Sequence, residues 1–306
     1  MGDSLLNKTF VVTGATSGIG LAVAEALAQR GAAVIGVGRS EERCAQAEER
    51  WRACHHQARV ACLVADLSVQ AEVRRLIEEI STLLATWGLT ALDGLANVAG
   101  TFTFWQTLTP DGFETQWAVN HLAPFSLTLG LLPLLRQAPM ARVVTVSSGS
   151  HYRTRLQWDD VQLQRRYQPL RAYKQTKLAN VLFTAELNRR LGTASTVRAF
   201  AADPGLVRTG IGFKARSGLA RWIWKLRLWR AVPPEDAARG IVFLLSEPSL
   251  QGSDAIYWKD CQPLRPSAYA LNEEHGARLW ELSARLCGLS DAACGEQLGD
   301  EPTTHG

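Results

Sequence analysis

Two side chains that could exchange protons stand one helical turn apart in this sequence. Tyr173 and Lys177 lie within residues 171–183, whose composition favours a helix, so both side chains leave the same face of that helix. An ammonium beside a phenol favours the phenolate, which predicts that the pKa of Tyr173 falls from about 10 towards working pH. Tyr173 is therefore a candidate general acid and base, with Lys177 as the group that tunes it. The same spacing also arises by chance between two surface residues, so the rest of the chain must decide.

A glycine-rich turn follows the first predicted strand, residues 9–13. Gly14, Gly18 and Gly20 stand at the start of an Ala- and Leu-rich segment that reaches about Arg30. Such a turn places backbone N–H groups and the positive end of a helix at one point, which suits a dinucleotide pyrophosphate. The spacing is Gly-x-x-x-Gly-x-Gly and not the more common Gly-x-Gly-x-x-Gly. A tight turn without a ligand is the alternative, but its position directly after the first strand favours binding.

Short apolar runs and helix-favouring runs alternate along the chain. The predicted strands cover residues 9–13, 33–37, 60–64, 92–96, 142–147 and 195–202. The predicted helices include two capped by Ser40 and Ser68, one that begins at Thr109-Pro110 and is kinked by Pro124, and the Tyr173 helix, which runs to about Leu191. Strands that are apolar along their whole length predict a parallel sheet with helices on both faces. We therefore predict an α/β protein with a single Rossmann-type doubly wound parallel sheet.

No linker, repeat or low-complexity block divides the chain, so residues 1–289 are predicted to form one domain. Residues 290–306 lack hydrophobic periodicity and are predicted to be a disordered tail. The composition, 46% apolar and 20% charged over 306 residues, is that of a globular protein, and a net charge of +4 is too small to indicate nucleic-acid binding. The six cysteines form no Cys-x-x-Cys pair, which predicts reduced thiols in a reducing compartment and no metal site. We find no signal peptide and predict no membrane-spanning stretch, hence a cytoplasmic protein.

Six motifs then occur in the order, and at the strand and helix ends, typical of one family. They are residues 13–20 (Thr-Gly-Ala-Thr-Ser-Gly-Ile-Gly), Asn97-Val98-Ala99-Gly100, Asn120, Ser147-Ser148, Tyr173-x-x-x-Lys177 and Pro204-Gly205. Over residues 8–260 the chain resembles the short-chain dehydrogenase/reductase family. The resemblance implies hydride exchange between a nicotinamide cofactor and an alcohol or carbonyl compound. A nucleotide-sensing or scaffold protein that keeps the fold without turnover is the alternative.

The resemblance also implies roles for four catalytic residues. Tyr173 would protonate the carbonyl oxygen or deprotonate the alcohol, and Lys177 would lower its pKa and hold the nicotinamide ribose. Ser148 would bond the substrate oxygen, and Asn120 would hold a water that relays protons to Lys177. Ser147 stays open as the alternative serine, because adjacent strand residues point to opposite faces and only one can face the site.

The cofactor residues follow from the same resemblance. They are Gly14, Thr16, Ser17, Gly18, Ile19, Gly20, Arg39, Asp66, Leu67, Asn97, Ala99, Gly100, Tyr173, Lys177, Pro204, Gly205 and Thr209. NAD-binding proteins usually carry an acid at the end of the second strand, whereas this chain has Gly38 followed by Arg39. A guanidinium can bind a phosphate through two hydrogen bonds, so NADP (NADPH) is predicted over NAD. Arg39 stacked on the adenine would weaken this preference without reversing it.

The substrate side resembles the retinol dehydrogenase-like branch, on residues 173–183 and 279–283 and on the long spacing from Ser148 to Tyr173. This resemblance implies a bulky, lipophilic alcohol, aldehyde or ketone. Phe102, Phe104 and Trp105 follow Asn97-Val98-Ala99-Gly100 directly and are candidate apolar walls of the pocket, although ordinary core packing explains them equally well. A substrate lid is predicted at residues 206–232. Its basic and apolar residues 213–230 fit a lid packed on the core, a peripheral membrane helix or, less well, a nucleic-acid patch. Many relatives pair through the Tyr173 and Asn120 helices, which implies a homodimer, with a monomer left open.

Overall fold

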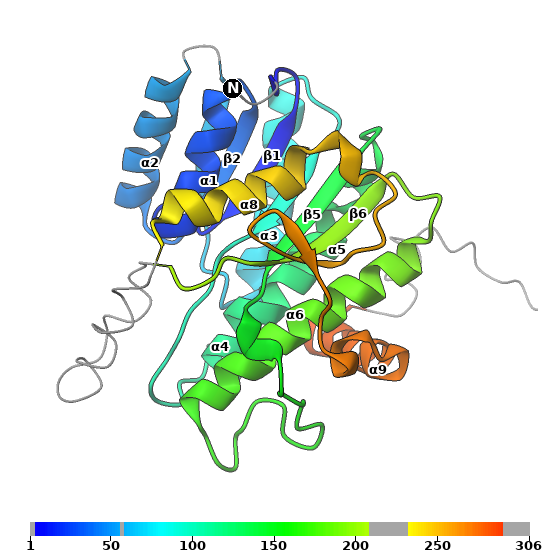
Figure 1. Ribbon diagram of the computed structural model, residues 1–306. Helices are drawn as coiled ribbons and strands as arrows, with labels where there is room; N and C mark the ends of the chain where they lie inside the picture. Colours follow the sequence, from blue (N-terminus) through cyan, green and yellow to red (C-terminus); the bar gives the residue numbers. More distant parts are fainter. Residues whose placement is uncertain (1–3, 56–57, 208–231, 290–306) are drawn as a thin grey trace, which may run out of the picture.

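The computed structural model describes residues 4–55, 58–207 and 232–289. They form one eight-stranded sheet with helices on both faces (Figure 1). The strands are β1 (Thr9–Thr13), β2 (Ala33–Gly38), β3 (Val60–Val64), β4 (Gly94–Asn97), β5 (Ala141–Val146), β6 (Val197–Asp203), β7 (Tyr257–Lys259) and β8 (Gln262–Leu264). The α-helices are α1 (Gly18–Gln29), α2 (Glu41–Cys54), α3 (Gln70–Thr86), α4 (Thr115–Trp117), α5 (Ala123–Arg136), α6 (Pro169–Leu191), α8 (Pro234–Ser246) and α9 (Glu273–Cys287). Shorter helical segments are η1 (Ala118–Leu122), η2 (Gly149–His151), η4 (Pro248–Leu250) and η5 (Ala268–Leu271).

The strand order is β3-β2-β1-β4-β5-β6-β7-β8, parallel from β3 to β7, with β8 antiparallel at the edge. The chain runs outwards from β1 to β3 and then returns to the other side of β1 to place β4. In a doubly wound sheet, the loops that follow β1 and β4 diverge at this switch point and leave a crevice at the carboxyl ends of the strands. The predicted doubly wound sheet is therefore confirmed. Strands β7 and β8 were not predicted, since each is only three residues long.

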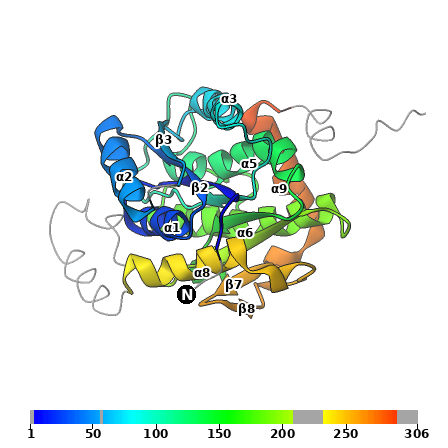
Figure 2. The same cartoon turned by 90° about the horizontal axis from the view of Figure 1, so that it is seen from above.

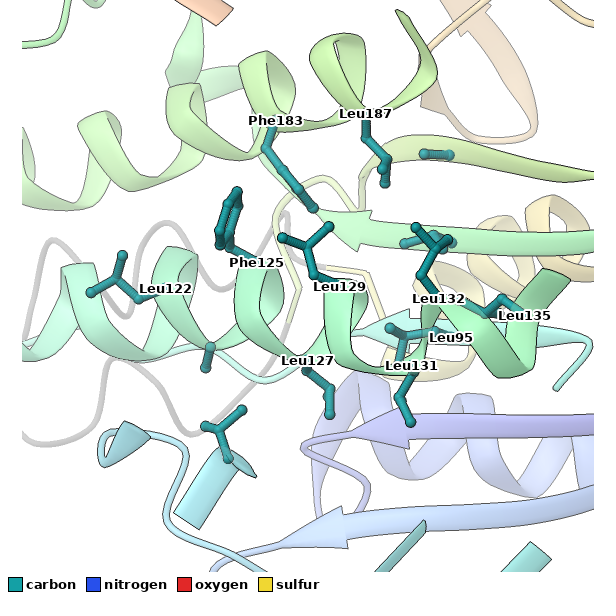
Figure 3. Close-up of a cluster of buried hydrophobic side chains, with 14 of the residues drawn as sticks. Leu95, Leu122, Phe125, Leu127, Leu129, Leu131, Leu132, Leu135, Phe183 and Leu187 are labelled. Atoms are coloured by element: carbon teal, nitrogen blue, oxygen red, sulfur yellow. The ribbon is translucent and has the colours of Figure 1, made fainter. Parts of the chain in front are cut away.

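Two hydrophobic cores lie on the two faces of the sheet. Helices α1, α2 and α8 cover one face, and α3, α5, α6 and α9 cover the other (Figure 2). Helix α5 is buried nearly all round, and its leucines point both towards β4 and towards α6, where Phe183 and Leu187 meet them (Figure 3). Each fully buried leucine or phenylalanine contributes about 1.5–3 kcal/mol. The sheet and α6, which will carry the site, are thus held rigidly.

The helix through Asn120 begins later than predicted. It begins at Thr115 after the cap Glu114, and Thr109-Pro110 lies in the preceding turn, where the Thr109 hydroxyl accepts from the Phe113 N–H. Ahead of Pro124 the helix widens into the π-helical turn η1, because proline has no N–H to donate and the ring needs space. The cap predicted at Ser68 is also wrong, since α3 begins after Val69. The cap at Ser40 is confirmed, and its hydroxyl accepts from the Arg43 N–H.

The same helix corrects the prediction that no stretch could span a membrane. The helix Thr115–Arg136 is long and apolar enough by length and composition, and an 18-residue window within it has a mean hydropathy of 1.4. Their side chains are mostly buried against the sheet and α6, however, as expected of a central core helix. The five described cysteines are free thiols, as predicted. Three predictions fall outside the described residues. They are the central part of the substrate lid (residues 208–231), the peripheral membrane helix within it (213–230) and the disordered tail (290–306).

Candidate active site

Helix α6 places Tyr173 and Lys177 over the carboxyl end of β5. The helix begins with Pro169, whose fixed φ suits a first position, and ends at Gly192, which has a φ of 74°. Its buried face packs on β5 and β6, so its register on the sheet is fixed. Tyr173 is partly buried, and Lys177 is 4% exposed.

The Lys177 ammonium is held by the end of β5. Its Nζ donates to the carbonyl oxygen of Val146 at 3.0 Å and lies 5.6 Å from the centre of the Tyr173 ring. Burial lowers the pKa of Lys177 to about 8, and the negative charge of Asp203 opposes this shift. Lys177 therefore loses its charge at a lower pH than an exposed lysine does. Its position beside Tyr173 is nevertheless the one that the sequence predicts.

The pKa of the Tyr173 phenol moves in the opposite direction to the sequence prediction. Burial raises it to about 12, the carboxylate of Asp203 raises it further, and a hydrogen bond with Ser148 lowers it. The prediction of an activated phenol is therefore wrong for this structure. The physical reason is that desolvation penalises the phenolate more strongly than its neighbours stabilise it.

The two adjacent serines take different roles. The Ser147 hydroxyl is 1% exposed and donates to the carbonyl oxygen of Lys177 at 2.8 Å, which ties β5 to α6. Ser148 faces the other way, beside the Tyr173 hydroxyl, and its own hydroxyl accepts from the Ser150 N–H at 3.2 Å. Of the two serines, Ser148 is therefore the one whose hydroxyl lies beside Tyr173, whereas the Ser147 hydroxyl is bonded to the main chain of α6.

Asn120 lies in the π-helical turn η1 with its side chain fully buried. Its Oδ1 accepts from the Thr101 N–H at 2.7 Å, and its Nδ2 donates to the Thr101 carbonyl at 3.0 Å and to the Thr176 hydroxyl at 3.1 Å. The carboxamide therefore holds the loop after β4 against α6. Because both Nδ2 protons have protein partners, the predicted water could be held only by Oδ1 or the backbone of Asn120. A Cβ added at Gly100 would lie 3.4 Å from Asn120 Oδ1 and 3.8 Å from Lys177 Nζ, so these three residues converge.

The glycine turn after β1 is closed so tightly that two positions require glycine. Gly14 has a φ of 67°, and a Cβ there would lie 3.0 Å from the Cα of Ala99. A Cβ at Gly20 would lie 2.3 Å from the carbonyl oxygen of Gly14. The main chain of the turn is therefore open to a ligand at its outer edge, where Ser17 is exposed and Thr16, Gly18 and Ile19 are partly exposed. This arrangement fits a dinucleotide at the start of α1.

Thr13, Asn97 and their partners join the turn after β1 to the loop after β4. The Thr13 hydroxyl accepts from the N–H groups of Val98 and Ala99, both at 3.0 Å. The Asn97 side chain is buried and donates to the hydroxyl of Thr128 at 3.1 Å. Asn97 thus points into the protein, and any contact of this residue with a cofactor would use its backbone.

The end of β2 has no room for an acid. A Cβ at Gly38 would lie 2.3 Å from Thr16 Cγ2 and 2.8 Å from Cys44 Sγ. Arg39, the next residue, is exposed and forms no ion pair with any part of the chain that the structure describes. Asp66 is exposed, accepts from the Ser68 N–H at 2.9 Å and follows β3, while Leu67 packs on the core.

A carboxylate that the sequence analysis passed over lies at the end of β6. Asp203 accepts from the Tyr257 hydroxyl at 2.9 Å and from the Gly205 N–H at 2.9 Å. The Tyr257 ring packs against His151 at 4.7 Å, and His151 Nδ1 lies 2.9 Å from the Ser148 carbonyl oxygen. Asp203 therefore links the Pro204-Gly205 turn to the loop of Ser148. An acid directly before Pro-Gly at a strand end is the signal that could have found it.

One aromatic ring stands next to the Tyr173 phenol, and a second ring packs on the first. Phe102 lies edge-on to the Tyr173 ring at 5.8 Å and to Phe104 at 5.1 Å. Trp105 is 80% exposed and does not close the site. The segment predicted as a lid has paired ends, since the Val232 N–H donates to the Leu206 carbonyl at 2.8 Å. Thr209 lies outside the described residues.

The doubly wound fold and the grouping of Tyr173, Lys177 and Ser148 are those of a nicotinamide-dependent oxidoreductase, and comparison with known proteins gives the same class. The family model described as short chain dehydrogenase matches residues 8–219, and the chain belongs to this family of oxidoreductases. Within the family it falls in the retinol dehydrogenase-like branch. Retinol dehydrogenase 14 of Mus musculus is 34% identical over 299 residues, which cover 92% of this chain and 86% of that protein.

Two solved structures are similar over most of the chain. An uncharacterised protein from Mycobacterium paratuberculosis has a TM-score of 0.73 and 34% identity, and the match covers 94% of this chain and 96% of the other. The landomycin C-6 ketoreductase LanV, solved with bound NADP and rabelomycin, has a TM-score of 0.63 and 26% identity, over 84% and 96% of the two chains.

Proposed function

We propose that this protein is an NADP-dependent oxidoreductase that transfers a hydride between the nicotinamide and a bulky apolar alcohol, aldehyde or ketone of retinoid or lipid type. The observation that carries the proposal is the convergence of Tyr173, Ser148 and Lys177 at the carboxyl end of β5, beside the glycine turn. Residues 1–289 act as a single domain in this proposal. The nicotinamide, when bound, supplies or accepts the hydride.

The chain itself supplies the proton and holds the substrate oxygen. Tyr173 donates its phenolic proton to a carbonyl oxygen, and Ser148 orients that oxygen with a hydrogen bond. A pKa of about 12 keeps the phenol protonated at neutral pH, which suits a proton donor. Lys177, near the ring, stabilises the phenolate that remains after transfer. Asn120 holds the loop after β4 and thereby fixes the wall of the site opposite α6.

The preference for NADP rests on the end of β2. There is no room at Gly38 for a side chain with a carboxylate, which would repel a 2′-phosphate. The guanidinium of Arg39 is exposed and available to bind a 2′-phosphate. The NADP bound to the similar ketoreductase LanV supports this choice. Asp66 completes the adenosine side of the proposed cofactor site.

The substrate class rests on the apolar side of the site. Phe102 places an aromatic ring against the Tyr173 ring, and Phe104 packs behind it on Phe102, so a polar substrate would gain little on this side. The name of the similar mouse protein, retinol dehydrogenase 14, supports a retinoid or a molecule like one. We also propose a cytoplasmic location with peripheral membrane contact, which a lipophilic substrate fits. We further propose a homodimer, and light scattering can check this oligomeric state.

The test is a spectrophotometric assay with NADPH or NADH and a panel of aldehydes that includes all-trans-retinal. We expect loss of NADPH absorbance with lipophilic aldehydes and a fall of about 10²–10⁴ in kcat for Tyr173→Phe. Arg39→Asp should reverse the preference from NADPH to NADH. Binding of NADPH without turnover of any carbonyl compound would favour the nucleotide-sensing alternative. Turnover that is unchanged by Tyr173→Phe would refute the mechanism.

A further inference from the structure

A cavity separate from the candidate active site lies beside the first turns of α6. Its volume is about 850 Å³, within the range of sites for small organic ligands. Residues of the connector between η2 and α6 form one side, and residues at the start of η5 form the other. The lining residues are Arg153, Thr154, Arg155, Tyr167, Gln168, Pro169, Leu170, Arg171, Lys174, Ser267 and Tyr269. Tyr173 and Ser148 are not among them.

The lining of this cavity is strongly positive. Arg153, Arg155, Arg171 and Lys174 all contribute to it, and the lining contains no aspartate or glutamate. None of the four forms an ion pair within residues 4–55, 58–207 and 232–289. The Arg171 guanidinium lies against the Gln157 carboxamide, a neutral partner that leaves its charge uncompensated. Four like charges around one cavity repel each other, and an anion would relieve that repulsion.

The start of α6 adds to the same field. The helix has 23 residues, its cap residue Gln168 makes no side-chain hydrogen bond to the first turn, and no acid lies in that turn. The N-terminus of a helix carries a partial positive charge and open N–H groups. Gln168, Pro169, Leu170 and Arg171 all line the cavity, so this positive end meets the cationic side chains. The cationic side chains and the helix N-terminus therefore both favour a negatively charged ligand.

The walls of the cavity are aromatic and firmly held. Tyr269 stacks on His275 with ring centres 4.0 Å apart. The Tyr167 hydroxyl donates to Glu114 at 3.0 Å and lies 2.8 Å from the Thr103 hydroxyl, so its ring is fixed at the cavity edge. Two rings with a proline and a leucine offer apolar surface next to the charges. Such a lining suits a molecule with a doubly charged group on an organic body.

We propose that this cavity binds an organic phosphate, either a soluble phosphorylated metabolite or the headgroup of a phosphorylated lipid. Arginine guanidinium groups bind phosphate oxygens through paired hydrogen bonds, and Lys174 supplies a point charge beside them. Leu170 and Lys174, which line the cavity, flank Tyr173 along α6, whereas Tyr173 itself is not part of the lining.

The test measures binding to the full chain saturated with NADPH, so that phosphate cannot occupy the cofactor site. One arm titrates inorganic pyrophosphate by calorimetry, and the other measures sedimentation with phosphatidylcholine vesicles, with and without phosphatidylinositol phosphate. We expect saturable binding in at least one arm, weakened by added salt. Arg155→Gln/Lys174→Gln should weaken it by a factor on the order of ten or more, because each lost charged hydrogen bond costs about a factor of ten. Binding in the first arm identifies a soluble ligand, and binding in the second arm alone identifies a lipid headgroup.

The matched control is Arg165→Gln/Arg166→Gln, which removes the same charge from exposed positions of the same connector outside the cavity lining. Both double variants should keep NADPH-dependent turnover, which shows that they fold. If Arg155→Gln/Lys174→Gln fails to fold, Arg155→Gln alone replaces it, with Arg165→Gln as its control. The proposal is overturned if neither arm shows binding, or if the control weakens binding as much as the cavity variant does.

Discussion

His121 should make the protein sensitive to mild acid. The ring is completely buried between three elements of the fold, with Nε2 2.8 Å from the Ser283 hydroxyl of α9 and Nδ1 3.4 Å from Asn180 Oδ1 of α6. Trp117 and Phe125 pack against it on the helix that carries Asn120. The described groups that face His121 include no carboxylate able to stabilise an imidazolium. Substituting His121→Gln keeps hydrogen-bonding capacity and removes the titration.

The magnitude follows from the pKa of the buried ring. Burial lowers the pKa of His121 from 6.5 to about 4. In the unfolded chain His121 takes up a proton with a pKa of about 6.5, whereas in the folded protein it does so only near pH 4. The contribution of the neutral ring to stability is therefore complete above pH 6.5 and is lost as the pH falls towards 4. At about 1.4 kcal/mol for each pH unit, the loss amounts to about 3 kcal/mol. This is a large share of the about 5–15 kcal/mol that stabilises a typical domain.

The measurement is urea unfolding of the wild type and His121→Gln across this pH range. At neutral pH the variant should be less stable by about 1–2 kcal/mol, because it packs less well against the aromatic rings. Its stability should then fall with acid by about 3 kcal/mol less than that of the wild type. His275→Gln, at a partly exposed ring that stacks on Tyr269, is the matched control for the loss of an imidazole. Equal pH dependence in the wild type and His121→Gln would refute the reasoning.

Three further outcomes test the site. Ser148→Ala should lower kcat for aldehyde reduction by about tenfold or more, whereas Ser147→Ala should keep kcat and lose about 1 kcal/mol of stability in a denaturation experiment, because its hydroxyl only ties β5 to α6. Gly20→Ala should weaken NADPH binding in a fluorescence titration, since its Cβ would lie 2.3 Å from a carbonyl oxygen of the turn; unchanged affinity would exclude the turn as the cofactor site. Asp203→Asn should move the pH profile of alcohol oxidation to lower pH, because its charge raises the pKa of Tyr173, and a profile that stays in place would remove Asp203 from the electrostatics of the site.

The parallel strands were predictable because each is a compact apolar run with a clear turn signal at its carboxyl end. The exceptions are the parallel strand β7 and the edge strand β8, since three-residue strands contain too little pattern and take their conformation from the neighbouring strands, β6 for β7 and β7 for β8. The start of the Asn120 helix was misplaced because Thr109-Pro110 has the composition of a helix start. In the structure the Thr109 hydroxyl instead closes a local turn with Phe113.

The positions of the site residues were more predictable than their chemistry. Residue spacing along α6 gives the relation between Tyr173 and Lys177, whereas the choice between Ser147 and Ser148 required the structure, which shows which hydroxyl lies beside Tyr173. The direction of the Tyr173 pKa could not be read from spacing at all. It depends on how deeply the phenol is desolvated and on Asp203, which approaches from a different strand.

The same burial that overturns the prediction of an ionised phenol supports its role as an acid. A phenol with a pKa of about 12 keeps its proton at neutral pH, and Asp203 strengthens that tendency. Lys177, with a pKa of about 8, retains most of its charge near neutral pH and can stabilise the phenolate once the proton has left. Reduction of a carbonyl compound starts from the protonated phenol, whereas oxidation of an alcohol must first form the phenolate. In the proposed mechanism, the protonated phenol is therefore the form that carbonyl reduction uses.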